Sequence, residues 1–282
     1  MTVYLLRNPT KPAATTVCLQ AAEILLSVGA HVILPPELRP LCSLEGVEYE
    51  MPHEALCKAE VVVAVGGDGT ILHTAKECLP YDKPILGINL GRTGFLSTCE
   101  VDEMPLKLSM LSKGQFQLDN RALLKATIDG NSANAKIALN DIVVFKGHRV
   151  QAIDYDIYCD NIQVDHCRGD GVIVSTPTGS TAYSMSAGGP ILDAHIRGLV
   201  VTPICAHALQ NPAIVFAEDR KITIQANSSD RNKIFIASDG GQEELLRDGG
   251  YVQVELSDKN VKLITFNPAD QFDAIGNKLR RR

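Results

Sequence analysis

Two hydrophobic patterns divide the chain into a first part of about 115 residues and a longer second part. In the first part, apolar runs such as Val61 to Val65 alternate with stretches whose apolar residues recur every three or four positions. Buried parallel strands show the first pattern and amphipathic helices the second. The patterns predict strands at 3–6, 31–34, 61–65 and 84–89, helices at 12–28, 71–79 and 102–111, and an irregular segment at 41–59. This order is typical of a doubly wound, mostly parallel sheet in an α/β domain.

From about residue 116 the pattern changes to many short strands. Ala122 to Ile128 and 134–138 flank Asp129-Gly130-Asn131, which indicates a hairpin. Further strands are predicted at 142–145, 150–158, 172–175, 199–204, 213–217, 220–226, 233–238, 251–256 and 261–265. So many short strands favour a β-rich, sandwich-like domain. We therefore expect an α/β domain at 1–115, a β-rich domain at 116–265, and a C-terminal tail at 266–282 that packs back on one of them.

Composition narrows the classes of function. The formal net charge of −6 disfavours a general nucleic-acid binder, and we interpret the basic residues Lys278 and 280–282 as a solvated terminus. No apolar run approaches the ~18 residues that a membrane helix needs, so no membrane partner is expected. The eight cysteines are scattered without a Cys-x-x-Cys pair. This spacing predicts reduced thiols and a cytoplasmic protein.

The loop Gly66-Gly67-Asp68-Gly69-Thr70 follows the strand at 61–65. Open α/β sheets bind ligands at the carboxyl ends of their strands, and glycines let backbone N–H groups approach a polyanion. The loop has neither the lysine of a P-loop nor a Gly-x-Gly-x-x-Gly sequence. We therefore expect phosphates to meet N–H groups and Mg²⁺, the ion being carried by nucleotide phosphates without direct protein ligands. The alternative is a tight turn with Asp68 as a helix N-cap.

A second informative segment is 169–190. A strand at 172–175 leads into a run of small hydroxyl residues, followed by Tyr183 and two glycines. Hydroxyl groups and exposed backbone can bind the edge of a purine or a ribose, and Tyr183 offers a flat face for stacking. A plain Ser/Thr/Gly-rich loop is the alternative. That alternative leaves unexplained why Asp170 and Tyr183 frame the run.

Together these motifs resemble the NAD kinases. The resemblance rests on Gly66–Thr70, on 86–96, on Leu139-Asn140-Asp141 and on 169–190, which occur in the family's order and at about its spacing. Ser238-Asp239-Gly240 is compatible but less diagnostic. The first loop is shared with lipid kinases and phosphofructokinases, whereas 169–190 is close to specific. The resemblance implies a transferase that phosphorylates the 2′-hydroxyl of the adenosine ribose of NAD with ATP and Mg²⁺, giving NADP, and a homo-oligomer, dimer or tetramer.

The resemblance also assigns roles to residues. Asp68 would be the catalytic residue, and its loop would bind phosphate through Gly66, Gly67, Gly69 and Thr70. The NAD-binding residues would come from several segments: Phe95, Asn140, Asp141, Arg168, Asp170, Thr178, Thr181, Ala182, Tyr183 and Ser186. Arg168 and Asp170 would act from the neighbouring part of the site, across a subunit interface if the protein is oligomeric. In a loose phosphoryl-transfer transition state the nucleophile first needs orientation, so Asp68 is expected to align the 2′-hydroxyl and take its proton late.

One departure from the family leaves other functions open. The family usually has glutamate where this chain has Asp141, and the shorter side chain would reach the sugar through a water. A dinucleotide-binding sensor without catalysis would be compatible with that change. A lipid or sugar kinase would share the first loop but would have no use for an adenosine pocket at 169–190. Formation of NADP from NAD, ATP and Mg²⁺ separates these alternatives.

Overall fold

The computed structural model describes residues 1–91, 94–147, 151–208, 211–227 and 233–267, together with 269, 272 and 274–276. Arg92 and Thr93 of the second glycine-punctuated loop, and the basic terminus within 277–282, lie outside the described residues. The chain forms two compact units, Met1–Asn120 with Val261–Arg282, and Arg121–Asn260. These divisions differ from the predicted ones because β7 (Gln117–Ile128) and β18 (Tyr251–Thr265) each contribute residues to both units.

The first unit is an α/β domain on a parallel sheet, as predicted. Its strands run in the order β3–β2–β1–β4–β5, and β6 and the end of β18 lie along β5. The strands are β1 (Thr2–Arg7), β2 (His31–Leu34), β3 (Val47–Tyr49), β4 (Val61–Gly66), β5 (Ile85–Asn89) and β6 (Cys99–Glu100). The helices are α1 (Pro12–Ser27), α2 (Pro52–Lys58), α3 (Asp68–Cys78) and α4 (Met104–Ser112), with 3-10 turns at Pro36–Leu41, Leu79–Tyr81 and Val101–Glu103. The segment 41–59, which looked irregular, contains β3 and α2.

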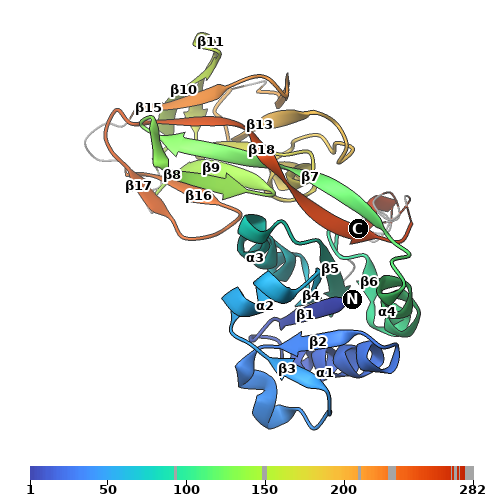
Figure 1. Ribbon diagram of the computed structural model, residues 1–282. Helices are drawn as coiled ribbons and strands as arrows, with labels where there is room; N and C mark the ends of the chain where they lie inside the picture. The colour runs from blue at the N-terminus through green and yellow to red at the C-terminus, as the bar shows by residue number, and fades with distance from the viewer. Residues whose placement is uncertain are drawn as a thin grey trace. The chain divides into compact units, whose positions relative to one another are not determined.

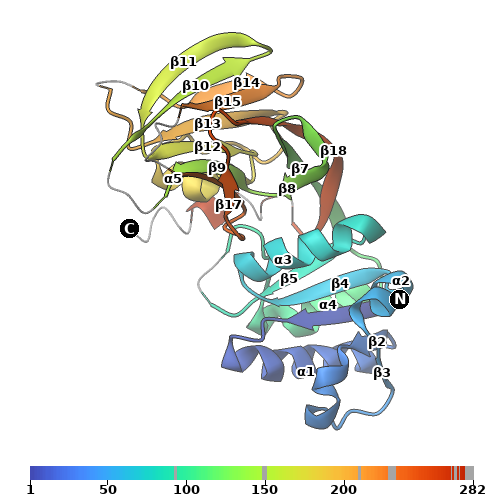
Figure 2. The same cartoon turned by 90° about the vertical axis from the view of Figure 1, so that its left-hand side faces the viewer.

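Helices cover both faces of this sheet (Figures 1 and 2). Leu86 and Ile88 of β5 belong to the core that includes α1 and α4. Gly87 lies between them and therefore faces the opposite side, where a Cβ would lie 2.3 Å from Ile71 Cδ1 of α3. The helices after β1 and β4 thus leave the sheet on opposite faces. That reversal makes the carboxyl ends of β1 and β4 the topological switch point, where doubly wound sheets bind ligands.

The second unit is an antiparallel β-sandwich, again as predicted. One sheet has the order β14–β13–β12–β9–β16–β17, and the other contains β11–β10–β15–β18 with β7 beside β18 and β8 beside β7. Apart from β7 and β18, the strands are β8 (Asn131–Ala138), β9 (Asp141–Lys146), β10 (Ile153–Cys159), β11 (Ile162–Gly169), β12 (Gly171–Ser175), β13 (Gly198–Ile204), β14 (Ile214–Ala217), β15 (Ile222–Asn227), β16 (Ile234–Ser238) and β17 (Glu244–Leu246). A 3-10 turn at Gly179–Thr181 and the short helix α5 (Tyr183–Ser186) follow β12.

The core of the sandwich comes from alternate residues of both sheets. Val172 and Val174 of β12 pack in one cluster with Ile222 and Ile224 of β15. The predicted hairpin is formed by β7 and β8, and its two turn residues, Asp129-Gly130, have φ of 51° and 74°. Positive φ at both positions suits the twist of a two-residue hairpin. No helix in the described part of the chain is long and apolar enough to cross a membrane.

Candidate functional site

The first glycine loop is a sharp turn between β4 and α3. All six residues of β4 are buried, so the strand delivers its carboxyl end from the middle of the sheet. The hydroxyl oxygen of Thr70 accepts hydrogen bonds from Gly67 N at 3.4 Å and from Asn8 Nδ2 at 3.2 Å. A Cβ on Gly66 would lie 2.1 Å from that oxygen, so the turn requires glycine there. Gly69 is exposed in the first turn of α3.

Asp68 is turned toward the second glycine-punctuated loop rather than capping its own helix. The N-cap of α3 is Gly67, so the alternative of Asp68 as N-cap is wrong. Phe95 N donates to Asp68 Oδ2 at 2.9 Å, and Leu96 N donates to Oδ1 at 3.2 Å. A carboxylate has about four acceptor sites, so oxygens held by these two amides can still accept further hydrogen bonds. The side chain is half-buried, and its position is set by main chain.

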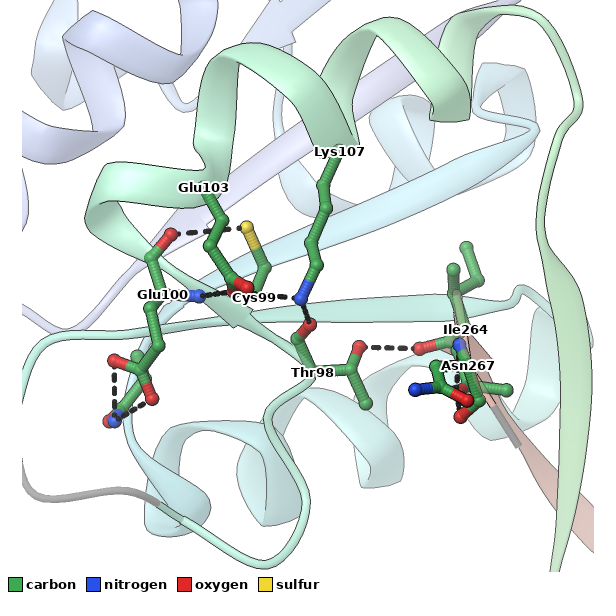
Figure 3. A network of polar contacts seen from close by, with 9 residues as sticks. Thr98, Cys99, Glu100, Glu103, Lys107, Ile264 and Asn267 are labelled. Atoms are coloured by element: carbon green, nitrogen blue, oxygen red, sulfur yellow. Dashed lines mark hydrogen bonds and ion pairs between the residues drawn. The ribbon is translucent and has the colours of Figure 1, made fainter. Parts of the chain in front are cut away.

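A network of polar contacts joins Thr98, Glu100, Glu103 and Lys107, in the segment that follows the second loop (Figure 3). Asn89 Nδ2 donates to Gly91 O at 3.2 Å and to Glu100 Oε1 at 3.0 Å, while Gly91 N donates to Asn89 Oδ1 at 3.3 Å. Glu103 accepts from Glu100 N at 2.9 Å and pairs with Lys107 at 2.7 Å. Burial opposes ionisation of Glu103, but these two partners outweigh it and hold its pKa below the ordinary value.

In the second unit, two sequence motifs meet at the start of β9. Asp141 pairs in register with Ser175 of β12, which brings Asn140 beside the turn after β12. Thr176 N donates to Asn140 O at 2.9 Å. A Cβ on Gly179 would lie only 1.9 Å from Asn140 O, so the hydroxyl-rich turn packs on the main chain of this motif. Asn140 is half-buried and Asp141 is buried.

Asp239 holds the main chain of that motif. Its carboxylate accepts hydrogen bonds from Leu139 N at 3.0 Å, Asn140 N at 2.7 Å and Asp141 N at 3.2 Å. Asp239 follows β16, which pairs with β9, and has a φ of 50°. The motif 238–240 was only a compatible feature of the sequence. Its role in holding this main chain depends on the pairing of β16 with β9, which the spacing of residues in the sequence does not reveal.

The hydroxyl run has an inner and an outer side. Thr176, Ser180 and Ser184 are fully buried, and each hydroxyl bonds to a neighbouring group, such as Leu139 O at 2.6 Å from Thr176 Oγ1. Thr178 is also buried, and its hydroxyl accepts from Arg121 Nη1 at 3.2 Å. The remaining predicted residues are less buried. Thr181 and Ala182 are half-buried, and Tyr183 and Ser186 are exposed.

Charged residues flank this turn. Lys146 Nζ pairs with Asp170 Oδ1 at 2.6 Å, and Arg168 Nε lies 4.0 Å from Asp154 Oδ1 on the neighbouring strand β10. Burial raises the pKa of the Tyr183 hydroxyl, and the nearby groups, Asp170 among them, add to the effect. The Tyr183 side chain is therefore a neutral aromatic surface at physiological pH, 46% exposed. The sequence motifs had not assigned a contact at this turn to Arg121, Lys146 or Asp239.

The predicted site residues form two groups. Asp68, its loop and Phe95 belong to the first unit, and the remaining predicted residues belong to the second. Phe95 is half-buried, and its main chain already contacts Asp68. Among the described residues, no group of three or more His, Cys, Asp or Glu side chains is arranged to hold a metal ion.

The chain is thus a two-domain protein with glycine-rich loops at the end of a parallel sheet and a hydroxyl-rich turn on a β-sandwich. A family model described as the ATP-NAD kinase N-terminal domain matches residues 3–116, and one described as the ATP-NAD kinase C-terminal domain matches 139–266. The chain belongs to the ATP-NAD kinase family.

Relatives named NAD kinase support this family assignment. The chain is 33% identical to the NAD kinase of Natranaerobius thermophilus over 281 residues, covering 98% of this chain and 97% of that protein. It is 36% identical to the NAD kinase of Ruminiclostridium cellulolyticum over 225 residues, covering 79% of each. Over 279 residues it is 33% identical to the NAD kinase of Moorella thermoacetica, covering 99% of this chain and 89% of that protein.

Solved structures show the same fold. A yeast NADH kinase complexed with NADH has a TM-score of 0.88 and 24% identity, covering 99% of this chain and 87% of that one. An NAD kinase from Archaeoglobus fulgidus in complex with ATP has a TM-score of 0.77 and 25% identity, covering 99% of both chains.

Proposed function

We propose that this protein is an NAD kinase, which transfers the γ-phosphoryl group of ATP to the 2′-hydroxyl of the adenosine ribose of NAD and produces NADP. The observation that carries the proposal is the Asp68 carboxylate, held by the amides of Phe95 and Leu96. It lies at the end of a buried strand beside three glycines. No observation favours the sensor or the lipid or sugar kinase over this activity.

Asp68 orients the nucleophile in this proposal. The amides of the second loop keep its carboxylate from rotating, and the carboxylate, which has about four acceptor sites, accepts the 2′-hydroxyl hydrogen. The proton passes to Asp68 as the new P–O bond forms, because a loose transition state needs little nucleophile activation. The transferred phosphoryl group is stabilised by the main chain of the first glycine loop and by the turn of that loop, through Gly66, Gly67, Gly69 and Thr70.

The second unit recognises the dinucleotide. Tyr183 stacks on the adenine, and Thr181, Ala182 and Ser186 line its surroundings on the outer side of the run. Asn140 and Asp141 bind the ribose and diphosphate region. The hydroxyl of Thr178 is bound by Arg121, so we assign Thr178 to the shape of the pocket. Arg168 and Asp170 bind at its border, and Phe95 is assigned to dinucleotide binding from its own loop in the first unit.

The metal ion, the cellular compartment and the oligomeric state are proposed on chemical grounds. Mg²⁺ bound to the ATP phosphates would neutralise part of their charge, and phosphate oxygens and water would be its main ligands. The donor set fits this arrangement, because Asp68 is the one carboxylate of the 66–70 loop and its oxygens are held by amides. We also propose a cytoplasmic homo-oligomer, dimer or tetramer. The scattered, unpaired cysteines agree with a reducing compartment.

Replacing Asp68 by Asn tests the central assignment. The amide keeps the size of the side chain but is a poor proton acceptor, so we expect NAD binding within about threefold of wild type and a kcat lowered at least ~10²-fold. NADP is measured with an NADP-specific dehydrogenase after incubation with NAD, ATP and Mg²⁺. Asp102→Asn, at an exposed position of the same unit, is the matched control. A near-normal kcat in Asp68→Asn refutes the role, and absence of NADP with wild-type protein refutes the proposed function.

A further inference from the structure

Lys11 lies at the topological switch point of the first unit. The turn 8–11 connects β1 to α1, and Asn8 Oδ1 accepts from Thr10 N at 2.9 Å and from Thr10 Oγ1 at 2.8 Å. The turn is tied to the end of β4, because Asn8 N donates to Val65 O at 2.9 Å, and to the first glycine loop, because Asn8 Nδ2 donates to Thr70 Oγ1 at 3.2 Å. Pro12 then begins α1. These contacts place Lys11 beside the end of β4, although the two segments are 55 residues apart.

The ammonium group of Lys11 lies over glycine backbone. Lys11 Nζ is 3.5 Å from Gly66 O, and a Cβ built on Gly67 or Gly91 would lie 3.3 Å or 3.9 Å from it. An ammonium has three donors, and this long contact to one carbonyl uses one of them. Within the described residues, no carboxylate pairs with Nζ at 4.0 Å or less. A half-buried cation thus faces a loop whose N–H groups favour an anion.

We propose that Lys11 binds phosphate oxygens of ATP at the first glycine loop and is a phosphate-binding residue of this kinase. The inference rests on the proposed function and deepens it. The loop 66–70 has no lysine of its own, and the turn after β1 supplies one from another segment. A flexible lysine suits this task because its compact charge can follow a phosphoryl group as the group moves. The switch point is the position in a doubly wound sheet where such a ligand binds.

Lys11→Met tests this role, because methionine keeps an unbranched stem of similar length without the charge. We expect ATP affinity, measured by calorimetry, to fall at least about tenfold, as for loss of a hydrogen bond to a charged group. NAD affinity should stay within threefold of wild type. Lys11→Arg keeps the charge and should recover most of the ATP affinity. Lys113→Met, at an exposed position after α4, is the matched control.

A loss of ATP affinity smaller than tenfold in Lys11→Met overturns the proposal, and so does an equal loss for NAD. If the variant does not fold, labelling of the wild-type protein decides. Reductive methylation of Lys11, followed by mass spectrometry, should slow relative to Lys113 when ATP is added, and an unchanged ratio overturns the proposal. Wild-type protein that binds ATP through Lys11 but forms no NADP would refute the proposed function alone. NADP formation with unaltered ATP affinity in Lys11→Met would refute the role of Lys11 alone.

Discussion

Gly94→Ala is expected to displace the Asp68 carboxylate, the proposed catalytic group, while leaving the fold intact. A Cβ built on Gly94 lies 2.1 Å from Asp68 Oδ1, 2.9 Å from Asp68 Cγ and 2.8 Å from Ser97 Oγ. Ordinary contact begins at 3.4 Å. The carboxylate must therefore retreat by about 1 Å or rotate away, which lengthens its hydrogen bonds to Phe95 and Leu96.

Gly94→Ala should affect the rate of catalysis more than the free energy of unfolding. A misplacement of 1 Å costs about 10²-fold in rate, which corresponds to about 2.7 kcal/mol in activation free energy. The cost in free energy of unfolding is smaller, about 1–2 kcal/mol, because Asp68 is half-exposed and water can replace part of its weakened hydrogen bonds. Catalysis should therefore fall well before stability does.

Kinetics and unfolding measured on the same variant separate these effects. We expect the kcat for NADP formation to fall about 10²-fold, with NAD affinity within threefold and a cooperative urea transition at slightly lower midpoint. Gly276→Ala is the matched control, because a Cβ there would lie within 4 Å of no atom in the part of the chain that the structure describes. A Gly94→Ala variant with kcat within threefold of wild type would show that the Asp68 position is not set by this loop. A variant that is largely unfolded would show that the clash is relieved by the backbone.

Three further predictions concern the second unit. Asp239→Asn removes the charge that holds the N–H groups of Asn140 and its neighbours, so the KM for NAD should rise about tenfold while that for ATP stays unchanged, and equal changes would contradict this role. Gly179→Ala sets a Cβ 1.9 Å from a backbone oxygen, and urea unfolding should show a loss of about 3 kcal/mol or more; a loss below 1 kcal/mol would contradict the packing. Burial opposes ionisation of Asp129, but Arg247 and the N–H of Tyr251 hold its pKa below the ordinary value. Its contribution to stability is therefore complete above the unfolded-state pKa of about 3.9 and is lost as pH falls through the lower folded-state pKa. Asp129→Asn should lower the free energy of unfolding at pH 7, with the difference closing below about pH 4; a gap that does not depend on pH would refute the argument.

Whether a strand could be predicted from the sequence depends on how far its side chains are buried. The strands β4 and β5 are buried on both faces, so the residues at 61–65 and 85–88 are apolar without interruption and the parallel sheet could be predicted. The strand β11 (Ile162–Gly169) was not predicted, because most of its side chains are exposed and carry no burial pattern. The two predicted strands at 251–256 and 261–265 are one continuous strand, β18, whose exposed middle residues resemble a break.

The candidate site was predictable in its residue types but not in its contacts. Glycines and an aspartate at 66–70 indicate a phosphate loop from composition alone. The partners of Asp68 are 27 and 28 residues away, and the contact between Asn140 and Asp239 spans 99 residues. Such pairs depend on which strands are neighbours in the sheet, and the local spacing of residues does not reveal the order of the strands. For the same reason the hydroxyl run did not reveal which of its members point inward.

Asp141 stands where the resemblance to the NAD kinases led us to expect a glutamate. Its N–H donates to Asp239, its carbonyl oxygen accepts from Asp239 N at 3.0 Å, and its strand position is paired with Ser175. The main chain is therefore held on both sides and cannot move forward to compensate for a side chain that is shorter by one methylene. Because the side chain is also buried, a swing outward would expose the start of β9. The contact from Asp141 to the ribose is thus expected to run through a bridging water, which retains most of the enthalpy of a direct hydrogen bond.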